Sequence, residues 1–385
     1  MDWFCPVLFW LSFFTLVYVY AGYLLLLKAL SFFYSQQHTV DETYQPTVTI
    51  LFSAHNEETS LPHKIESIRR LNYPQDKIQV LAASDASTDG TAAFLSSQPD
   101  IEALILPTHG GKNVALNQLI PNATGELLFF TDANTVFHPD CLQRIARHYA
   151  NPRVGCVTGN LVFTHEADWN PVGRSTGLYW RYENGIKALE NQLGSVLVGG
   201  GSLLTARRGR IQTLHPRIAN DLEIPMRLGA AGDLVLYEKD GVGFEKPHTD
   251  VREELRRTSR IVARGLRGFG QLFPVILQRP FRLWQFLSHK FLRWLTLPIG
   301  LCLWGSAACL QDRPFAFFVF WAGAFLLLGA CLGLLAMRLA PANRFFKPFT
   351  ILGHLLVMYT GASWGLLLTL FGKTPAVWTI PQSSR

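Results

Sequence analysis

Short apolar runs alternate with segments of helical spacing in the first half of the chain, beginning at Thr47. The runs are rich in β-branched and aromatic residues and end in polar turns, which predicts strands, and the spacing between them predicts helices. The expected strands lie at 48–53, 78–84, 103–106 and 126–131, and the expected helices at 61–71, after residue 91 and at 113–119. Strands that alternate with helices predict an α/β fold in which a mostly parallel sheet is covered on both faces.

The strand expected at 126–131 delivers Asp132 to its carboxyl end, and Asn134 follows two residues later. In an open α/β sheet, ligands bind outside the carboxyl ends of the strands. A carboxylate there, followed by a second oxygen ligand, suits a divalent cation that itself holds a diphosphate. The alternative is that Asp132 only caps the following turn.

Long apolar segments lie at both ends of the chain and are long enough to cross a bilayer. They are expected at 7–27, 295–311, 315–337 and 349–372, and they are uncharged if His354 is neutral. The first could be a cleaved signal peptide, but the residues before it include Asp2 and no Lys or Arg, which favours a membrane anchor.

Basic residues flank these segments on one side. Lys28 follows the first span, and the loop at 338–347 has three bases and no acid, so both cues place the large domain in the cytoplasm. The sequence thus predicts a multi-pass protein of the cell (inner) membrane. The segment 269–294 interleaves Phe, Leu and Trp with bases, which is typical of a helix in the headgroup layer, although such a stretch can also pack on its own domain.

Composition and charge narrow the function classes. Of 385 residues, 49% are hydrophobic and 16% charged, with a formal net charge of +7. Much of the base lies at 252–293, next to apolar segments, which favours membrane lipids and a phosphorylated substrate over nucleic acid. Six cysteines without CxxC spacing indicate a reducing compartment and no disulfide framework. The expected parts are an anchor at 1–33, a soluble domain at 45–267, interface helices at 268–294, three spans at 295–373 and a tail at 374–385.

Four expected strand ends carry polar groups. These are Asn56 with Glu57, Asp85 with Asp89, the run Gly110, Gly111 and Lys112, and Asp132 with Asn134. Together they offer what a donor nucleotide needs: acceptors for the base, glycines that admit phosphate, a cation and a metal-binding carboxylate. Each has an ordinary alternative as a turn residue, a solvated loop charge or a first-turn acid.

These stretches resemble the donor-binding half of glycosyltransferase family 2, in the processive-type branch with a cytoplasmic GT-A domain and membrane helices. The matching stretches are 53–58 (SAHNEE), 84–91 (SDASTDGT), 110–117 (GGKNVALN) and 123–134 (ATGELLFFTDAN), with further likeness at 179–183, 219–221 and 257–265. The resemblance implies a GT-A, Rossmann-like fold with a mixed, mostly parallel sheet.

The resemblance also implies roles for individual residues. Donor and substrate binding would fall to Ala54, Asn56, Glu57, Asp85, Lys112, Asp132, Gly200 and Arg257. Asp132 matches the first metal-binding residue of the DxD motif and Asn134 replaces the second, so the cofactor would be Mg²⁺ or Mn²⁺. Asp221 matches the catalytic base, with Asn220 in place of the acid before it. Arg260 matches the Arg of QxxRW and is expected to assist the leaving group, although the Gln and Trp of that motif are absent.

Other interpretations of these residues stay open. Asn220 and Asp221 precede an apolar-periodic segment, as a helix N-cap does. Gly199, Gly200 and Gly201 could form a plain flexible turn, and His248 could complete a metal shell, although a lone loop histidine usually does not.

The resulting hypothesis is inverting transfer of a sugar from a nucleotide-diphosphosugar, with a UDP-sugar favoured, to a polysaccharide or lipid-linked acceptor. The alternatives are a transferase that adds a single sugar to a glycolipid, and a membrane protein that binds a nucleotide-sugar without turnover. The sugar, the linkage and any partner protein are not predicted.

Overall fold

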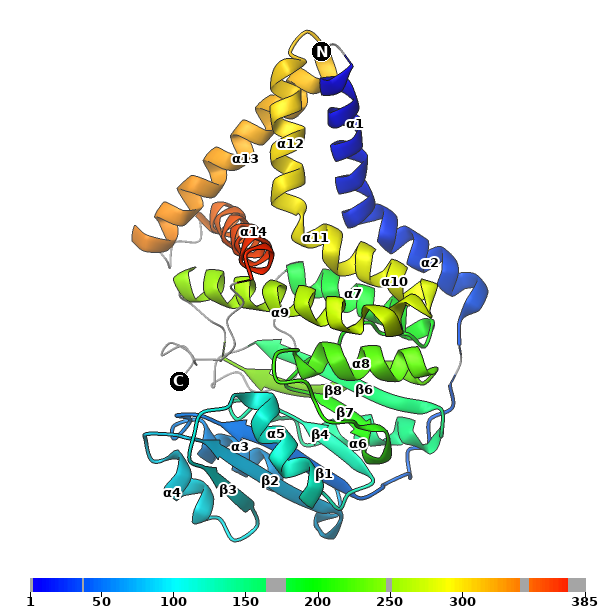
Figure 1. Cartoon of the computed structure of the whole chain (residues 1–385), viewed down its shortest axis with the longest axis vertical. Coiled ribbons are helices and arrows are strands. Elements are labelled where there is room, and N and C mark those ends of the chain that lie inside the picture. Colours follow the sequence, from blue (N-terminus) through cyan, green and yellow to red (C-terminus); the bar gives the residue numbers. More distant parts are fainter. Residues whose placement is uncertain (1–2, 37, 164–177, 247–250, 340–345, 373–385) are drawn as a thin grey trace. The chain divides into compact units, whose positions relative to one another are not determined.

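The computed structural model describes residues 3–36, 38–163, 178–246, 251–339 and 346–372 (Figure 1). The chain divides into two compact units. The first comprises 1–26, 249–266 and 284–374, and the second comprises 27–248, 267–283 and 375–385.

The second unit is built on an eight-stranded sheet in the order β3-β2-β1-β4-β7-β6-β8-β5 (Figure 1). The strands are β1 Val48–Ala54, β2 Ile78–Asp85, β3 Glu102–Leu106, β4 Leu127–Phe130, β5 Val136–Phe137, β6 Val154–Phe163, β7 Leu204–Arg207 and β8 Leu234–Glu245. The first four in this order are parallel, β7 is antiparallel to both β4 and β6, and β6 and β8 are parallel. The predicted α/β class with a mixed, mostly parallel sheet is confirmed.

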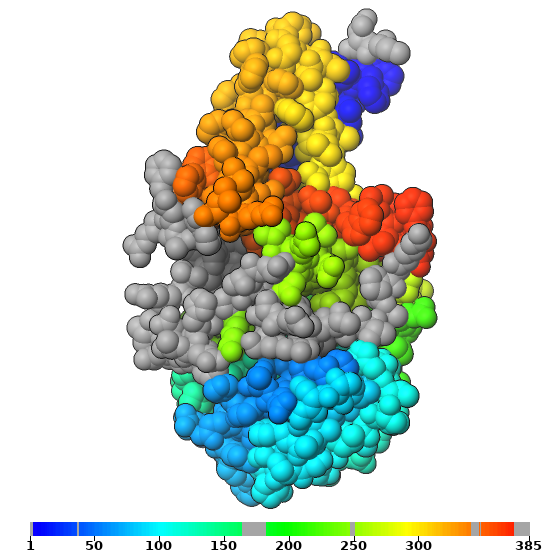
Figure 2. All heavy atoms as spheres, turned by 90° about the vertical axis from the view of Figure 1, so that its left-hand side faces the viewer, coloured from blue at the N-terminus to red at the C-terminus, as the bar shows by residue number. Residues whose placement is uncertain are grey.

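Helices cover both faces of the sheet because its central strands are apolar on both sides. In β1, Ile50 and Phe52 belong to one core and Leu51 to the other. The helices are α3 Leu61–Arg69, α4 Thr91–Ser96, α5 Lys112–Leu119, α6 Cys141–Ala146, α7 Leu178–Gln192 and α8 Asn220–Ala231. Residues of α3 and α6 pack in the first core and residues of α5 and α8 in the second. In the space-filling view, the segment from β1 to β4, blue to cyan, is one closely packed body (Figure 2).

The first unit contains most of the apolar helical residues. Among the described residues, three helical segments are long and apolar enough to cross a membrane: Phe4–Tyr34, Pro314–Leu339 and Pro348–Leu370. The first consists of α1 Phe4–Val17, a π-helical turn Tyr18–Gly22 and α2 Tyr23–Tyr34, and the other two lie in α13 Pro314–Leu339 and α14 Lys347–Leu370. The span expected at 295–311 corresponds to α12 Thr296–Cys309, which qualifies only together with the preceding Pro280–Trp294, from which it is bent by 63°.

One helix runs through the expected end of the soluble domain. The helix α9 Val251–Leu277 is continuous across residues 267 and 268, and α10 Pro280–Gln285, a π-helical turn and α11 Leu292–Trp294 follow it. Within the first unit, α13 and α14 approach each other through glycines. A Cβ atom on Gly333 would overlap the carbonyl of Phe349, and one on Gly353 would lie 2.9 Å from the Leu334 nitrogen. Such close helix contacts through small residues are typical of membrane helices.

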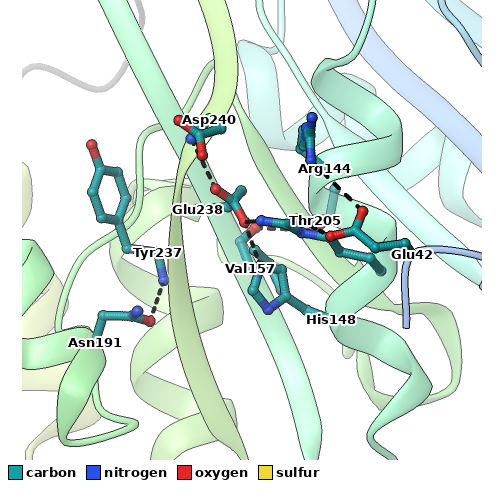
Figure 3. A network of polar contacts seen from close by, with 10 residues as sticks. Glu42, Arg144, His148, Val157, Asn191, Thr205, Tyr237, Glu238 and Asp240 are labelled. Atoms are coloured by element: carbon teal, nitrogen blue, oxygen red, sulfur yellow. Dashed lines mark hydrogen bonds and ion pairs between the residues drawn. The ribbon is translucent and has the colours of Figure 1, made fainter. Parts of the chain in front are cut away.

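In the second unit, a polar network centred on the buried Glu238 joins the segment that precedes β1 to the sheet (Figure 3). Arg147 contacts Glu42 of that segment and also donates to Glu238 Oε2 of β8 at 2.7 Å. His148 Nε2 lies 2.7 Å from the same oxygen of Glu238, and the Asp240 N–H donates to the other oxygen at 2.8 Å. Burial alone would raise the pKa of Glu238, but the hydrogen bonds from His148 and Arg147 outweigh it and lower the pKa to about 2.

We expect the Glu238→Gln variant to lose about 3 kcal/mol of folding stability at neutral pH, because the carboxylate is favoured in the folded state. A lowered pKa stabilises the fold above the ordinary glutamate pKa, and this contribution is lost as the pH falls toward about 2. The stability difference between the native chain and the variant should therefore shrink on acidification. Urea unfolding of the detergent-solubilised protein between pH 3 and 7 measures it, with the exposed Asp240→Asn as the control. A difference that stays constant with pH would contradict this account.

Candidate active site

Asp132 lies two residues after the end of β4, and both of its carboxylate oxygens accept contacts from side chains. Lys112 Nζ lies 2.5 Å from Oδ1, and the Ser202 hydroxyl donates to Oδ2 at 2.7 Å. Burial alone would raise the pKa of Asp132, but the Lys112 ammonium outweighs this effect and lowers it. The carboxylate is therefore ionised at neutral pH, as a ligand of a cation must be. The alternative that Asp132 serves only as a turn cap does not account for these two long-range contacts.

Lys112 joins two parts of the chain that are far apart in sequence. It is the first residue of α5, and its Nζ also donates to the Gly201 carbonyl at 3.0 Å. The residue before the helix, Gly111, has φ 86°, a left-handed conformation that favours glycine. The glycine therefore sets the direction from which α5 begins and from which Lys112 reaches Asp132.

The glycine-rich loop before β7 also approaches Asp221. A Cβ atom on Gly201 would lie 3.6 Å from Asp221 Oδ2, and the Gly199 N–H donates to the Asp221 carbonyl at 2.9 Å. The Gly200 N–H donates to Thr158 Oγ1 of β6 at 2.7 Å, which holds the loop to the sheet. The loop therefore lies against Asp221, Lys112 and Thr158, and these contacts hold it in place.

Asp221 does not act as the N-cap of α8. The cap position is Ala219, whose side chain makes no capping bond, and Asp221 lies in the first turn. Two asparagines of α5 fix the approach to this turn. Asn113 donates to the Ile218 carbonyl at 2.8 Å, and Asn117 donates to the Leu214 carbonyl at 2.7 Å. The motif stretch 110–117 thus positions Asp221 as well as Lys112, a role that the sequence did not reveal.

Asp85 holds the loop that leads into α5. Its two carboxylate oxygens accept hydrogen bonds from the Gly110 and Gly111 N–H groups, each at 2.8 Å. Its carbonyl oxygen lies 2.6 Å from His55 Nδ1 and 3.2 Å from His109 Nδ1, and the two imidazole rings lie 4.1 Å apart. This histidine pair was not predicted. A direct contact between Asp85 and a nucleotide stays a prediction.

The residues at the end of β1 lie against the loop after β2. Asn56 has φ 57°, which asparagine tolerates, and its Oδ1 accepts from the Thr88 N–H at 2.7 Å. The buried Glu57 donates its N–H to Thr91 Oγ1 at 2.8 Å, and Ala54 is buried at the strand end. These expected donor-pocket residues therefore gather at the carboxyl ends of β1 and β2.

Arg257 and Arg260 belong to the other compact unit, in the first part of α9. Arg257 Nη1 lies 3.4 Å from Glu254. Burial, followed by repulsion from Arg264 and Arg257, lowers the pKa of Arg260 to about 10. Their expected part in the chemistry stays a prediction, and His248 lies outside the described residues.

A divalent cation fits the residues around Asp132 only in part. Asp132 and the half-buried Asn134 offer a carboxylate and an amide oxygen, and in the described part of the chain no group of three or more His, Cys, Asp or Glu side chains could hold a metal. Magnesium-like ions are often held by one or two carboxylates together with substrate phosphates. The arrangement suits a cation that arrives with a diphosphate, and Lys112 would have to move from Asp132 to admit it.

Comparison with known proteins identifies the family. Residues 49–207 match the family described as Glycosyl transferase family 2. The matched residues extend from β1 to β7 and include Asp85, Lys112 and Asp132. This part of the chain belongs to glycosyltransferase family 2, a family of transferase enzymes, and the predicted resemblance to this family is confirmed. The processive-type branch stays a prediction.

Relatives and a solved structure support the family and the fold. The chain is 28% identical over 128 residues to a beta-monoglucosyldiacylglycerol synthase of Synechocystis sp. and 31% identical over 117 residues to a poly-beta-1,6-N-acetyl-D-glucosamine synthase of Staphylococcus epidermidis. These matches cover 32% and 29% of this chain but only 27% and 28% of the relatives. The fold is similar to that of a mannosyltransferase from Pyrobaculum calidifontis, solved with GDP-Man and Mn²⁺, with a TM-score of 0.70 and 22% identity over 95% of this chain and 99% of that one.

We expect Asp85→Asn to destabilise the domain by about 1–3 kcal/mol, because one amide N–H₂ would face a glycine N–H and leave a buried donor without an acceptor. The variant should also bind nucleotide more weakly. Thermal unfolding and UDP binding measure the two effects, with the exposed Asp76→Asn as the control. Lost UDP binding at unchanged stability would instead show that Asp85 contacts the nucleotide and does not build the loop.

Proposed function

We propose that this chain is a membrane-bound inverting glycosyltransferase that moves a sugar from a nucleotide-diphosphosugar to a lipid-linked or polysaccharide acceptor. The observation that supports it best is the meeting of two acids at one loop. Asp132 and Asp221 are far apart in sequence, yet Lys112 links Asp132 to the Gly201 carbonyl, and Asp221 flanks the same glycine. An inverting transfer needs such a pair, with a base near the acceptor and cationic groups near the leaving diphosphate.

In this mechanism Asp221 accepts a proton from the acceptor hydroxyl, whose oxygen attacks the anomeric carbon. The nucleoside diphosphate departs from the opposite face of the sugar, through a transition state with oxocarbenium character. Lys112 stabilises the negative charge that grows on the diphosphate. Mg²⁺ or Mn²⁺, held by Asp132 and Asn134 together with phosphate oxygens, would supply further electrostatic stabilisation when bound.

The relatives bear on the two substrates. A synthase of a glycolipid and a synthase of a polysaccharide both resemble the chain, which supports a lipid or glycan acceptor without choosing between them. We propose a UDP-sugar as the donor. The similarity in fold to a mannosyltransferase solved with GDP-Man makes GDP-sugars the necessary comparison. The basic loop at 338–347 and Lys28 support a cytoplasmic placement of the sheet domain, in the inner membrane.

The donor is tested with a panel of UDP- and GDP-sugars offered to detergent-solubilised protein with Mg²⁺ or Mn²⁺, scored by nucleotide release. Release with one donor identifies the donor and the metal, and the length of the product then separates polymer synthesis from a single addition. Nucleotide-sugar binding without release from any donor and acceptor would favour a binding protein over an enzyme.

For the donor that responds, we expect Asp221→Asn to lower kcat about 100-fold or more, because the amide cannot accept the proton. The affinity for UDP should stay unchanged, because Asp221 is assigned to the acceptor side. Nucleotide release and UDP binding are measured on the same preparations, with Asp240→Asn as the control. Unchanged release from the Asp221→Asn protein would rule out the mechanism.

A further inference from the structure

A lysine lies buried behind the candidate metal loop. Lys64 of α3 is 0% exposed, and its Nζ donates to Thr131 Oγ1 at 2.8 Å and to the Thr135 carbonyl at 2.9 Å. The same nitrogen lies 3.6 Å from the ring centroid of Phe137. Burial lowers the pKa of Lys64 well below its ordinary range. Burial of an amino group costs desolvation free energy unless hydrogen bonds offset that cost, so the partners of Lys64 Nζ indicate what the residue does.

Those partners are the two ends of one short turn. Thr131 precedes Asp132, and Thr135 follows Asn134, so the turn from 131 to 135 contains both oxygen ligands proposed for a cation. A single nitrogen that contacts the first and the last residue of the turn limits how far they can move apart. Lys64 therefore acts on Asp132 without touching it.

A second contact path reaches the same turn from β8. The Thr135 hydroxyl donates to Glu245 Oε1 at 2.6 Å, and the Ser202 hydroxyl lies 2.6 Å from that oxygen and 2.7 Å from Asp132 Oδ2. Glu245 thus links the far end of the turn to the residue that holds the carboxylate of Asp132. The turn is held at 131 by Lys64 and at 135 by both Lys64 and Glu245.

The two lysines near Asp132 differ in their freedom to move. The Lys112 side chain is 16% exposed and contacts Asp132 directly, whereas Lys64 is fully buried. A donor diphosphate can therefore draw Lys112 away from Asp132, but it cannot draw Lys64. After Lys112 has moved, the contacts of Lys64, Glu245 and Ser202 still define where Asp132 points.

We propose that Lys64 is a positioning residue for the cation and diphosphate site, because its Nζ contacts both ends of the 131–135 turn that carries Asp132 and Asn134. This inference rests on the proposed function for the identity of the ligands. Lys64 then raises the affinity of the site for a cation although it is not itself a ligand. A lysine that served only the packing of the core would affect stability and leave cation affinity unchanged.

The test measures Mn²⁺ binding without turnover, by electron paramagnetic resonance of free Mn²⁺, for protein alone and with UDP or GDP. We expect Lys64→Met to weaken Mn²⁺ binding about tenfold, in the range found when residues that support metal ligands are removed. Thr131→Val, which removes one acceptor of Nζ, should weaken binding in the same direction, and Thr131→Ser should restore it. The matched control is Lys187→Met, since Lys187 is also buried and lies near an aromatic ring, that of Tyr237.

The outcomes separate the proposal from its alternatives. Unchanged Mn²⁺ affinity in folded Lys64→Met or in Thr131→Val would overturn it, and tighter binding by Lys64→Met would show that the lysine only repels the cation. If Lys64→Met does not fold, the Mn²⁺ affinities of Thr131→Val and Thr131→Ser test the proposal in its place. Mn²⁺ binding is measured without turnover, so it can be interpreted even if the protein shows no transferase activity. Failure of the proposed function and failure of this inference are therefore distinguishable.

If the protein is active, the dependence of turnover on Mn²⁺ concentration provides a second test of the proposal. In Lys64→Met, the Mn²⁺ concentration for half-maximal turnover should rise about tenfold, while kcat at saturating Mn²⁺ should stay within about threefold of the native value. A loss confined to kcat would contradict a role in presenting the cation ligands.

Discussion

The ammonium of Lys112 is the contact on which the candidate site depends. It lies between the carboxylate of Asp132, at the end of a parallel strand, and the carbonyl of Gly201, in the loop before the antiparallel strand β7. Because Asp221 approaches the same glycine, this one group relates both acids to a common point. It also keeps Asp132 ionised despite burial, which a cation-binding carboxylate requires.

Around this contact, backbone groups do much of the positioning. The N–H groups of Gly110 and Gly111 are held by Asp85, and the N–H of Gly200 is held by Thr158. At Gly201 a Cβ atom would lie 3.6 Å from Asp221 Oδ2, an ordinary contact distance, so this backbone lies next to the carboxylate of Asp221. The polar residues of the site are therefore divided between those that face its centre and those, such as Asp85 and Thr158, that hold its loops.

Much of the fold follows from local pattern. The alternation of apolar strands and helices from Val48 onward predicted the parallel half of the sheet, since burial on both faces leaves a continuous apolar run in each central strand. The antiparallel insertion of β7 was not predicted, because Leu204–Arg207 is short and pairs with strands distant in sequence. The span expected at 295–311 is long enough only together with the helix before it, from which it is bent by 63°, and hydropathy along the sequence contains no information about such a bend.

For the site, the sequence pointed to Lys112 and Asp132 as candidates for a diphosphate and its cation, and to Asp85 as a candidate for the nucleoside, because they follow expected strands or lie in a glycine-rich turn. How these residues meet depends on contacts between distant parts of the chain. The buried Lys64, and Ser202 with Glu245, carry no local signal, because a lysine in a helix and a serine after glycines are usually solvated. Their importance comes from contacts between residues 43 to 110 positions apart, and a pattern within one helix or strand contains no information about such contacts.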